Sequence, residues 1–353
     1  MYYYFITGKW EIIKNINSVN SAILGTGSYL PDFVLDNGMF DQTVKTNDEW
    51  IVSRTGIKER RVEQEKYNFE MIGEACKYAL DDSGILADDI DIIIVSSVTQ
   101  DYSYPSAACL VQNYIQANNA FSFDIAAACA GFVFALDISD AYIKSGRAKN
   151  ILVASGDIMT RETDYFDRGN CILFGDGAGA AVVSACGPQE GRGIVSCYIN
   201  CDCRGQNPYF IHSGLYEPGE IFDKETKRFK GNTVKKSDSY LWQNGSEVLR
   251  FVSKAVPKAL DESLKRAGKH VSELKYIILH QANKRIIDHV IEKYGLDPVK
   301  VPINIDRYGN MSSSTVPVLL DELNSSGRLE RGDLIALVGF GSGFAYGSVI
   351  IKW

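Results

Sequence analysis

The chain has 353 residues, of which 45% are hydrophobic and 23% are charged, and its formal net charge is -7. This length and hydrophobic content allow a large core and indicate about two domains or one doubled domain. The acidic balance argues against the surface of a nucleic-acid binder. No apolar run is long enough to cross a bilayer, and the aromatic N-terminal residues lack the apolar core and cleavage site of a signal peptide.

Eight cysteines are present and none forms a Cys-x-x-Cys pair, which favours reduced thiols in a cytoplasmic protein. Cys197, Cys201 and Cys203 lie close together in the sequence. Their spacing suits a strand, and no nearby histidine completes a set of metal ligands. We therefore expect no metal site and no cofactor.

Two halves of the chain repeat one order of predicted elements. This order is helix, strand, helix, strand, at residues 78–84, 92–97, 130–145 and 151–155 and again at residues 263–268, 276–280, 314–325 and 334–338. Each half then closes with a glycine-rich turn and a last apolar strand. Helices that alternate with continuous apolar strands indicate sheets covered on both faces. The repeat predicts a duplicated α/β fold with an extension over 1–21 and halves over 22–187 and 188–353.

A polar, glycine-rich and charged stretch from about residue 203 to 239 interrupts this symmetry. We interpret this stretch as a long excursion between two predicted secondary-structure elements. Loops of that length are either functional or mobile.

Cys129 is the candidate nucleophile. It follows the apolar run that ends in Ile125 and three alanines, and a helix-like segment begins at once after it. This pattern places the sulfur at a strand-to-helix turn, where small neighbours leave room for a substrate. The partial positive charge of a helix N-terminus favours the thiolate, which is the nucleophilic form. A buried, inert cysteine is the alternative.

His280 and Asn310 are the candidate partners of Cys129. His280 alone among the four histidines follows a buried-strand pattern at its C-terminal end, where ligands bind in open α/β sheets. Pseudo-symmetric halves bring equivalent strand ends together, so both residues can face Cys129. A cysteine with a histidine and an asparagine suits acyl transfer. The alternatives are a core histidine and a turn-forming asparagine.

These residues carry a resemblance to a known family. The chain resembles β-ketoacyl-acyl-carrier-protein synthase III, of the thiolase superfamily, in the three catalytic motifs AAACAGF at 126–132, HQANKRI at 280–286 and GN at 309–310. It is also similar to that family in GTGSYLP at 25–31, DEWIVSRTGI at 48–57, FGDGAG at 174–179 and GFGSG at 339–343. The resemblance covers residues from about 22 to 353 and implies a layered αβαβα fold with two pseudo-symmetric halves.

The resemblance implies a decarboxylating Claisen condensation that initiates fatty-acid synthesis. Cys129 takes an acyl group from acyl-coenzyme A, which serves as substrate, and malonyl-acyl-carrier protein then enters. His280 and Asn310 stabilise the enolate that forms as carbon dioxide leaves. The backbone N–H groups of Cys129 and Ser342 form the oxyanion hole. A specialised paralogue that condenses another acyl donor in secondary-metabolite synthesis would keep the same motifs.

The resemblance also implies where the substrates bind. The coenzyme A contacts are Trp50, Arg54, Thr55, Arg168 and Asn283, with Trp50 and Arg168 on opposite faces of the adenine. The acyl pocket is shaped by Phe174, Phe340 and Tyr104, the last reaching across a homodimer. Because these three side chains are bulky, we expect short acyl groups to react best.

An acidic carrier protein requires a basic docking surface. Arg250, Lys254 and Lys258 recur at every fourth residue, so on a helix they form one stripe. Pro257 lies within this stretch, and a proline inside a helix favours a kink. Arg285 lies close to His280 in sequence and is the fourth docking candidate. The alternative is an ordinary solvated face.

Three features depart from the family pattern: Met311 and the serines after Asn310, the length of the 203–239 excursion, and the extension before Ala22. None involves Cys129, His280 or Asn310. A cysteine protease is disfavoured because the sequence context of Cys129 and the duplicated pattern are both wrong for it. A silent partner subunit would have lost Cys129. Chalcone-synthase-like enzymes share the Cys-His-Asn set but elongate on coenzyme A, and 3-hydroxy-3-methylglutaryl-coenzyme A synthases need a glutamate that we do not place.

Overall fold

The computed structural model describes residues 19–202, 211, 213 and 240–353 in full, and the backbone alone of residues 3–6, 9–12, 212, 222–223 and 228–229. Most of the predicted extension and excursion, with Cys203, therefore lies outside the described residues. Two small ribbons fall within these stretches. They are β1 (Tyr3–Ile6) with β2 (Lys9–Ile12), and β12 (Phe222–Asp223) with β13 (Arg228–Phe229).

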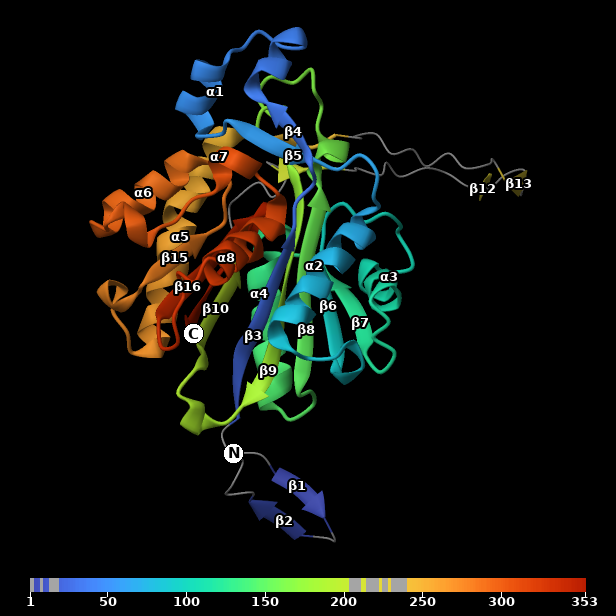
Figure 1. Cartoon of the computed structure of the whole chain (residues 1–353), viewed down its shortest axis with the longest axis vertical. Coiled ribbons are helices and arrows are strands. Elements are labelled where there is room, and N and C mark those ends of the chain that lie inside the picture. Colours follow the sequence, from blue (N-terminus) through green and yellow to red (C-terminus); the bar gives the residue numbers. More distant parts are fainter. Residues whose placement is uncertain are drawn as a thin grey trace.

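Two sheets form the frame of the molecule (Figure 1). The first has five strands in the order β3 (Asn20–Tyr29), β9 (Asp176–Cys186), β8 (Asn150–Ile158), β6 (Ile92–Ser96) and β7 (Phe121–Ile125). The second has four strands in the order β10 (Gly193–Cys201), β17 (Ala345–Lys352), β16 (Leu334–Gly341) and β15 (Tyr276–Leu279).

The strand directions repeat between the two sheets. In the first, β9 is antiparallel to β3 and to β8, and β8 is parallel to β6. In the second, β17 is antiparallel to β10 and to β16, and β16 is parallel to β15. The repeated order that the sequence predicts is thus a repeated sheet topology. The domain boundary at residue 188 stays a prediction, and it lies between the end of β9 and the start of β10.

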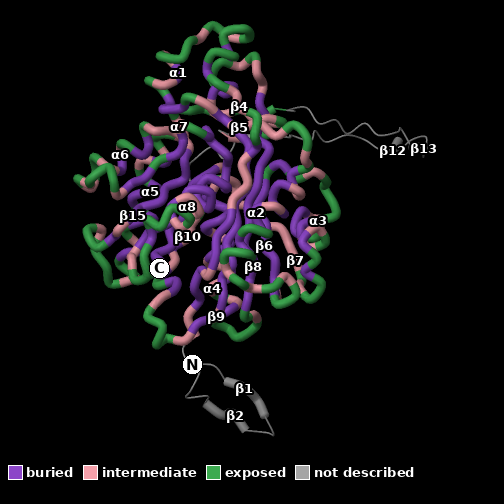
Figure 2. Tube along the Cα trace, in the orientation of Figure 1, coloured by how far each residue is buried: buried purple, intermediate pink, exposed green. Residues whose placement is uncertain are grey.

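Helices fill three layers around the two sheets. The middle layer holds α4 (Gly131–Lys144) and α8 (Thr315–Ser325), whose Phe132, Leu136 and Leu320 pack with apolar side chains of both sheets. On the outer faces lie α2 (Asn68–Ser83) and α3 (Ala107–Tyr114) against the first sheet, and α5 (Gly245–Ala267) and α6 (Lys284–Tyr294) against the second. Figure 2 shows the buried interior between exposed outer helix faces.

Local signals explain where these helices begin and end. Asn244 caps α5 by accepting a hydrogen bond from the Glu247 backbone N–H, and Gly268 ends it in the left-handed conformation. Pro257 is buried within α5, and the helix continues across it as one element.

A smaller group of elements covers one end of the strands (Figure 1). It includes α1 (Asp48–Thr55), the paired β4 (Phe33–Asp36) and β5 (Glu59–Val62), and the short helix α7 (Ile305–Tyr308). No helix in the part of the chain that the structure describes is long and apolar enough to cross a membrane.

Candidate active site

Cys129 lies in the turn that joins β7 to α4. Ala128 before it adopts a left-handed φ of 45°, and Gly131 after it begins α4. A Cβ on Gly131 would lie 1.7 Å from Ser96 Oγ, so only glycine allows the helix to start this close to the end of β6. The chain therefore turns sharply at Cys129 and presents its thiol beside the N-terminus of α4, as the sequence predicts.

His280 follows β15 directly and is 1% exposed. Its backbone N–H donates to the Val338 carbonyl at 2.8 Å, and its Nδ1 lies 2.6 Å from Thr315 Oγ1. Burial lowers the pKa of His280 to about 3, so the imidazole is neutral at physiological pH. Nε2 has no hydrogen-bond partner within the described ranges.

Asn310 is held in place by hydrogen bonds of its backbone and of its side-chain amide oxygen. Its N–H donates to the Leu173 carbonyl at 2.9 Å, and its own carbonyl accepts from Gly175 at 3.2 Å. Its Oδ1 accepts from the Ser312 backbone N–H at 2.9 Å. Oδ1 is thereby occupied, whereas Nδ2 donates to no described residue.

Cys129 and Asn310 line one cavity of about 750 Å³. This volume lies within the usual range of about 300–1,000 Å³ for ligand pockets. The cavity also includes Phe174 and Ser342, together with apolar side chains that the sequence analysis did not single out: Val98, Ile125, Phe134, Ile138, Met159, Ile211 and Leu241. Phe134 and Ile138 lie four residues apart on α4, so helical spacing after Cys129 is the signal that could have indicated them.

Two of the three predicted acyl-pocket aromatics do not line this cavity. Phe340 is buried and packs edge-on against the His280 ring, with centroids 4.9 Å apart, so its observed contact is with the histidine. Tyr104 is 87% exposed on its own chain. Phe174 alone of the three borders the cavity, which weakens the argument that crowding restricts the site to short acyl groups.

The Cys129 thiol is not a ready thiolate in this site. Burial raises its pKa to about 12, with a smaller opposing effect from the Ser312 hydroxyl and a smaller raising effect from Asp157. The neutral thiol therefore predominates at neutral pH. The partial positive charge of the helix N-terminus, which the sequence predicts beside the sulfur, acts in the opposite direction to this effect of burial.

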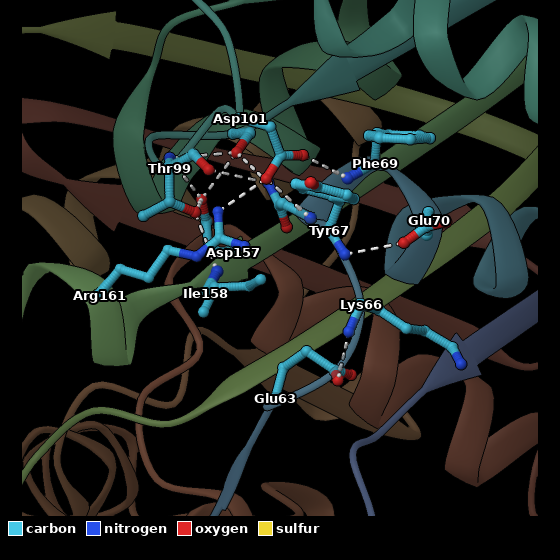
Figure 3. Close-up of polar contacts among 12 residues, drawn as sticks. Glu63, Lys66, Tyr67, Phe69, Glu70, Thr99, Asp101, Asp157, Ile158 and Arg161 are labelled. Carbon is cyan, nitrogen blue, oxygen red and sulfur yellow. Dashed lines mark hydrogen bonds and ion pairs between the residues drawn. The ribbon is translucent and has the colours of Figure 1, made fainter.

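Asp157 is close enough to Cys129 to raise the pKa of its thiol, and it forms a buried polar network with its neighbours. Figure 3 shows part of this network. Oδ1 of Asp157 accepts hydrogen bonds from the Val98 and Thr99 backbone N–H groups at 2.7 and 3.2 Å and from the Thr99 hydroxyl at 3.1 Å. Burial raises the pKa of Asp157 to about 6. Nearby, Asp101 caps α2 and pairs with Arg161 at 2.7 Å.

The predicted coenzyme A residues fall into two groups. The guanidinium carbon of Arg168 lies 3.9 Å from the centre of the Trp50 ring, and that of Arg54 lies 5.8 Å from it. Arg168 therefore stacks directly on Trp50 and occupies the space that an adenine between them would need, which differs from the predicted arrangement on opposite faces of the adenine. Thr55 does not join these three residues. It is buried, and its hydroxyl donates to the Ile51 carbonyl at 2.7 Å, so it is not placed to contact a nucleotide.

Asn283 and Arg285 lie close to Asn310. Asn283 caps α6 by accepting from the Arg285 backbone N–H at 3.0 Å. Both line a second cavity of about 170 Å³, which shares Gln243 and Asn310 with the larger one. This arrangement suits a narrow channel that leads to Asn310.

The structure brings three of the predicted docking residues together. Arg250, Lys254 and Lys258 all line one shallow hollow on α5, with Asp202, Glu247 and Tyr346. Arg250 pairs with Glu247 at 2.9 Å, which reduces its free charge. Arg285 does not line this hollow and instead lines the cavity of about 170 Å³. Of the predicted cysteine cluster, Cys197 forms no disulfide with a described residue, and no group of metal-ligating side chains occurs among the described residues.

The fold is a duplicated α/β fold of five layers. One cavity holds a cysteine and an asparagine, and a histidine lies at the adjoining strand end. Together these features define a thiolase-like condensing enzyme. Comparison with known proteins supports the same class. Models of the 3-oxoacyl-[acyl-carrier-protein (ACP)] synthase III family match residues 123–203 and, for the C-terminal part, residues 264–353. The chain belongs to the β-ketoacyl-[acyl-carrier-protein] synthase III family, and it is an acyltransferase.

Individual relatives show how far the similarity extends. The chain is 40% identical to the β-ketoacyl-[acyl-carrier-protein] synthase III of Desulfitobacterium hafniense (strain Y51), over 95% of this chain and 98% of that protein. It is similar to the solved 3-oxoacyl-[acyl-carrier-protein] synthase III of Aquifex aeolicus VF5, with 36% identity, a TM-score of 0.84, and coverage of 94% of this chain and 100% of that one. It is also similar to the priming β-ketosynthase of the R1128 polyketide pathway, with 31% identity, a TM-score of 0.83, and coverage of 96% and 98%. The predicted thiolase-like fold and family are confirmed.

Proposed function

We propose that the chain joins an acyl group from acyl-coenzyme A to malonyl-acyl-carrier protein, with loss of carbon dioxide, and so initiates fatty-acid synthesis. The observation that carries this proposal is the shared cavity of Cys129 and Asn310, with the neutral His280 held at the adjoining strand end. One nucleophile and two neutral donors are what a decarboxylating condensation requires.

Acylation comes first. Cys129 Sγ attacks the thioester carbonyl and loses its proton, coenzyme A leaves as the thiol with that proton, and an acyl-cysteine thioester remains. The backbone N–H groups of Cys129 and Ser342 stabilise the oxyanion. Gly341 supports this assignment because it packs directly on Cys129, which brings the following residue to the same wall.

Condensation follows. The carboxylate of the malonyl group leaves as carbon dioxide, and its bonding electrons form an enolate whose oxygen accepts hydrogen bonds from His280 Nε2 and Asn310 Nδ2. The enolate carbon then attacks the acyl-cysteine, the carbon–sulfur bond breaks, and the Cys129 thiolate that leaves takes up a proton from solvent. The fixed Oδ1 of Asn310 and the Thr315 contact of His280 support these roles because both side chains are oriented before substrate arrives.

The binding roles follow the same proposal. Trp50, Arg54 and Arg168 hold the nucleotide, and Asn283 contacts the pantetheine arm. The acidic carrier protein docks on the hollow at Arg250, Lys254 and Lys258, with Arg285 as the fourth docking residue.

We also propose a cytoplasmic homodimer. The homodimer is supported by β7, one of the two edge strands of the first sheet, where Phe121 is exposed, and by the exposed Tyr104.

A donor comparison tests the proposed function. Acetyl-coenzyme A is supplied with either malonyl-carrier protein or malonyl-coenzyme A, and the 3-oxoacyl product is measured. We expect product on the carrier protein and little on coenzyme A. The reverse preference would identify a chalcone-synthase-like enzyme instead. The secondary-metabolite alternative has one observation in its favour, the similarity to a polyketide-priming synthase, and it differs only in the acyl donor.

A further inference from the structure

The acyl cavity contains a carboxylate in a mostly apolar wall. Glu162 ends the short helical turn Met159–Glu162, and it lines the cavity with Met159, Phe134 and Leu241. Its Oε2 accepts a hydrogen bond from the hydroxyl of Ser213, which lines the same cavity. Gln243 is a further polar residue in this lining.

The base of the excursion holds these polar groups in place. The strands β11 (Ile211–His212) and β14 (Trp242–Gln243) pair antiparallel, with Ile211 opposite Gln243. The Leu241 backbone N–H donates to the Glu162 carbonyl at 2.6 Å. The Ser342 hydroxyl donates to the Ile211 carbonyl at 2.6 Å. The excursion is thus joined both to the turn that carries Glu162 and to the proposed oxyanion loop.

No described cation neutralises Glu162. The adjacent Arg161 points to Asp101, with which it pairs at 2.7 Å (Figure 3). A partly buried carboxylate without a cationic partner is costly unless it is hydrogen-bonded. An ionised carboxylate accepts about four hydrogen bonds, and Ser213 supplies one of them. With respect to the described residues, Glu162 therefore retains acceptor capacity in the cavity that it lines.

We propose that Glu162, with Ser213 and Gln243, binds a hydroxyl group on the acyl chain, so that the preferred donor is a hydroxyacyl-coenzyme A. A hydroxyl both donates and accepts, which matches the carboxylate acceptor of Glu162 beside the amide donor of Gln243. The Ser213 hydroxyl donates its proton to Glu162 and so holds the carboxylate in place. An ammonium group only donates, and a second carboxylate would be repelled. This inference rests on the proposed function, because it assumes that the cavity receives the acyl group carried by Cys129.

Competitive loading of Cys129 tests the proposal. The wild type receives butyryl-coenzyme A mixed with an equal concentration of either 3-hydroxybutyryl- or 4-hydroxybutyryl-coenzyme A, and intact-protein mass gives the ratio of the two acyl-enzymes. We expect at least one hydroxyacyl group to load about tenfold or more over butyryl, since a site built for a hydroxyl discriminates against the analogue that lacks it. Glu162→Leu should shift the ratio toward butyryl, and Glu162→Gln should shift it less.

The ratio is measured within each variant, so a general loss of rate cancels. The control Glu65→Gln changes an exposed carboxylate in the loop before α2 and should leave the ratio unchanged.

Butyryl loading as fast as both hydroxyacyl groups in the wild type would overturn the proposal. A ratio that stays constant in Glu162→Leu while all donors slow equally would overturn it too, because Glu162 would then contact the shared pantetheine. Preference for 4-aminobutyryl-coenzyme A would replace the hydroxyl site by a cation site. If no donor loads, including acetyl-coenzyme A, the proposed function itself fails, and this inference fails with it.

Discussion

Gly341 packs against Cys129 so closely that a Cβ on Gly341 would lie 2.6 Å from the Cys129 backbone nitrogen. The first residue belongs to the end of β16 in the second sheet, and the second belongs to the turn after β7 in the first sheet. This contact joins the nucleophile of one half of the molecule to the glycine-rich loop of the other. It leaves no room for a side chain.

Gly341→Ala should therefore slow acylation of Cys129. The added methyl group must displace backbone, and a shift of about 1 Å at a reacting centre costs on the order of 10²-fold in rate. The measurement is the rate of acetyl loading by intact-protein mass. Gly38→Ala is the matched control, since its nearest neighbour would be the end of the Asp36 side chain at 3.1 Å. Equal loading rates in both variants would contradict the proposed position of the oxyanion loop.

His280→Ala and Asn310→Ala should impair decarboxylation far more than loading. Both side chains present their unoccupied donors where the enolate oxygen is proposed, and loss of one such donor costs about 10²–10³-fold. Acylation is followed by mass and carbon dioxide release from malonyl-carrier protein by isotope label. The exposed His270→Ala provides the control. Normal carbon dioxide release with abolished loading would reverse the assigned roles.

The pH dependence of Cys129 alkylation should reveal its protonation state. Burial raises the thiol pKa to about 12, so the thiolate fraction, and with it the rate of reaction with iodoacetamide, should rise about tenfold per pH unit from pH 7 through pH 10. Peptide mass mapping separates Cys129 from the exposed Cys109. A plateau that begins near pH 8 would show that the helix N-terminus outweighs burial after all.

Ile138→Trp should make the enzyme more selective for short acyl groups. Ile138 lines the cavity from α4, and the larger ring would fill space that a long chain needs. The ratio of kcat/KM for octanoyl- to acetyl-coenzyme A should fall at least about tenfold relative to the wild type. Tyr104→Ala provides the comparison for the pocket across the proposed dimer. An unchanged ratio in Ile138→Trp would mean that the acyl chain takes another path.

The sequence indicates Cys129 and His280 because each follows a local pattern, an apolar strand that ends in small or polar residues. It does not reveal that Phe340 packs on His280, because that contact joins two neighbouring parallel strands. The prediction that Thr55 contacts the nucleotide does not agree with the structure, for a local reason. The Thr55 hydroxyl donates a hydrogen bond to the carbonyl four residues earlier, and the side chain therefore turns inward. Ile211 and Leu241 lie in and beside a stretch without periodicity, so only the fold shows that they close the cavity.

The acyl-enzyme itself gives the most direct test of the central claim, that Cys129 carries the acyl group between the two substrates. Wild type and Cys129→Ala are incubated with acetyl-coenzyme A, weighed by intact-protein mass spectrometry, and then mixed with malonyl-carrier protein. We expect the wild type to gain the mass of one acetyl group, located on Cys129 by peptide mapping, and to lose it as 3-oxobutyryl-carrier protein forms. Cys129→Ala should gain nothing. Equal acetylation of both proteins, or an acetyl group on Cys129 that malonyl-carrier protein does not remove, would contradict it.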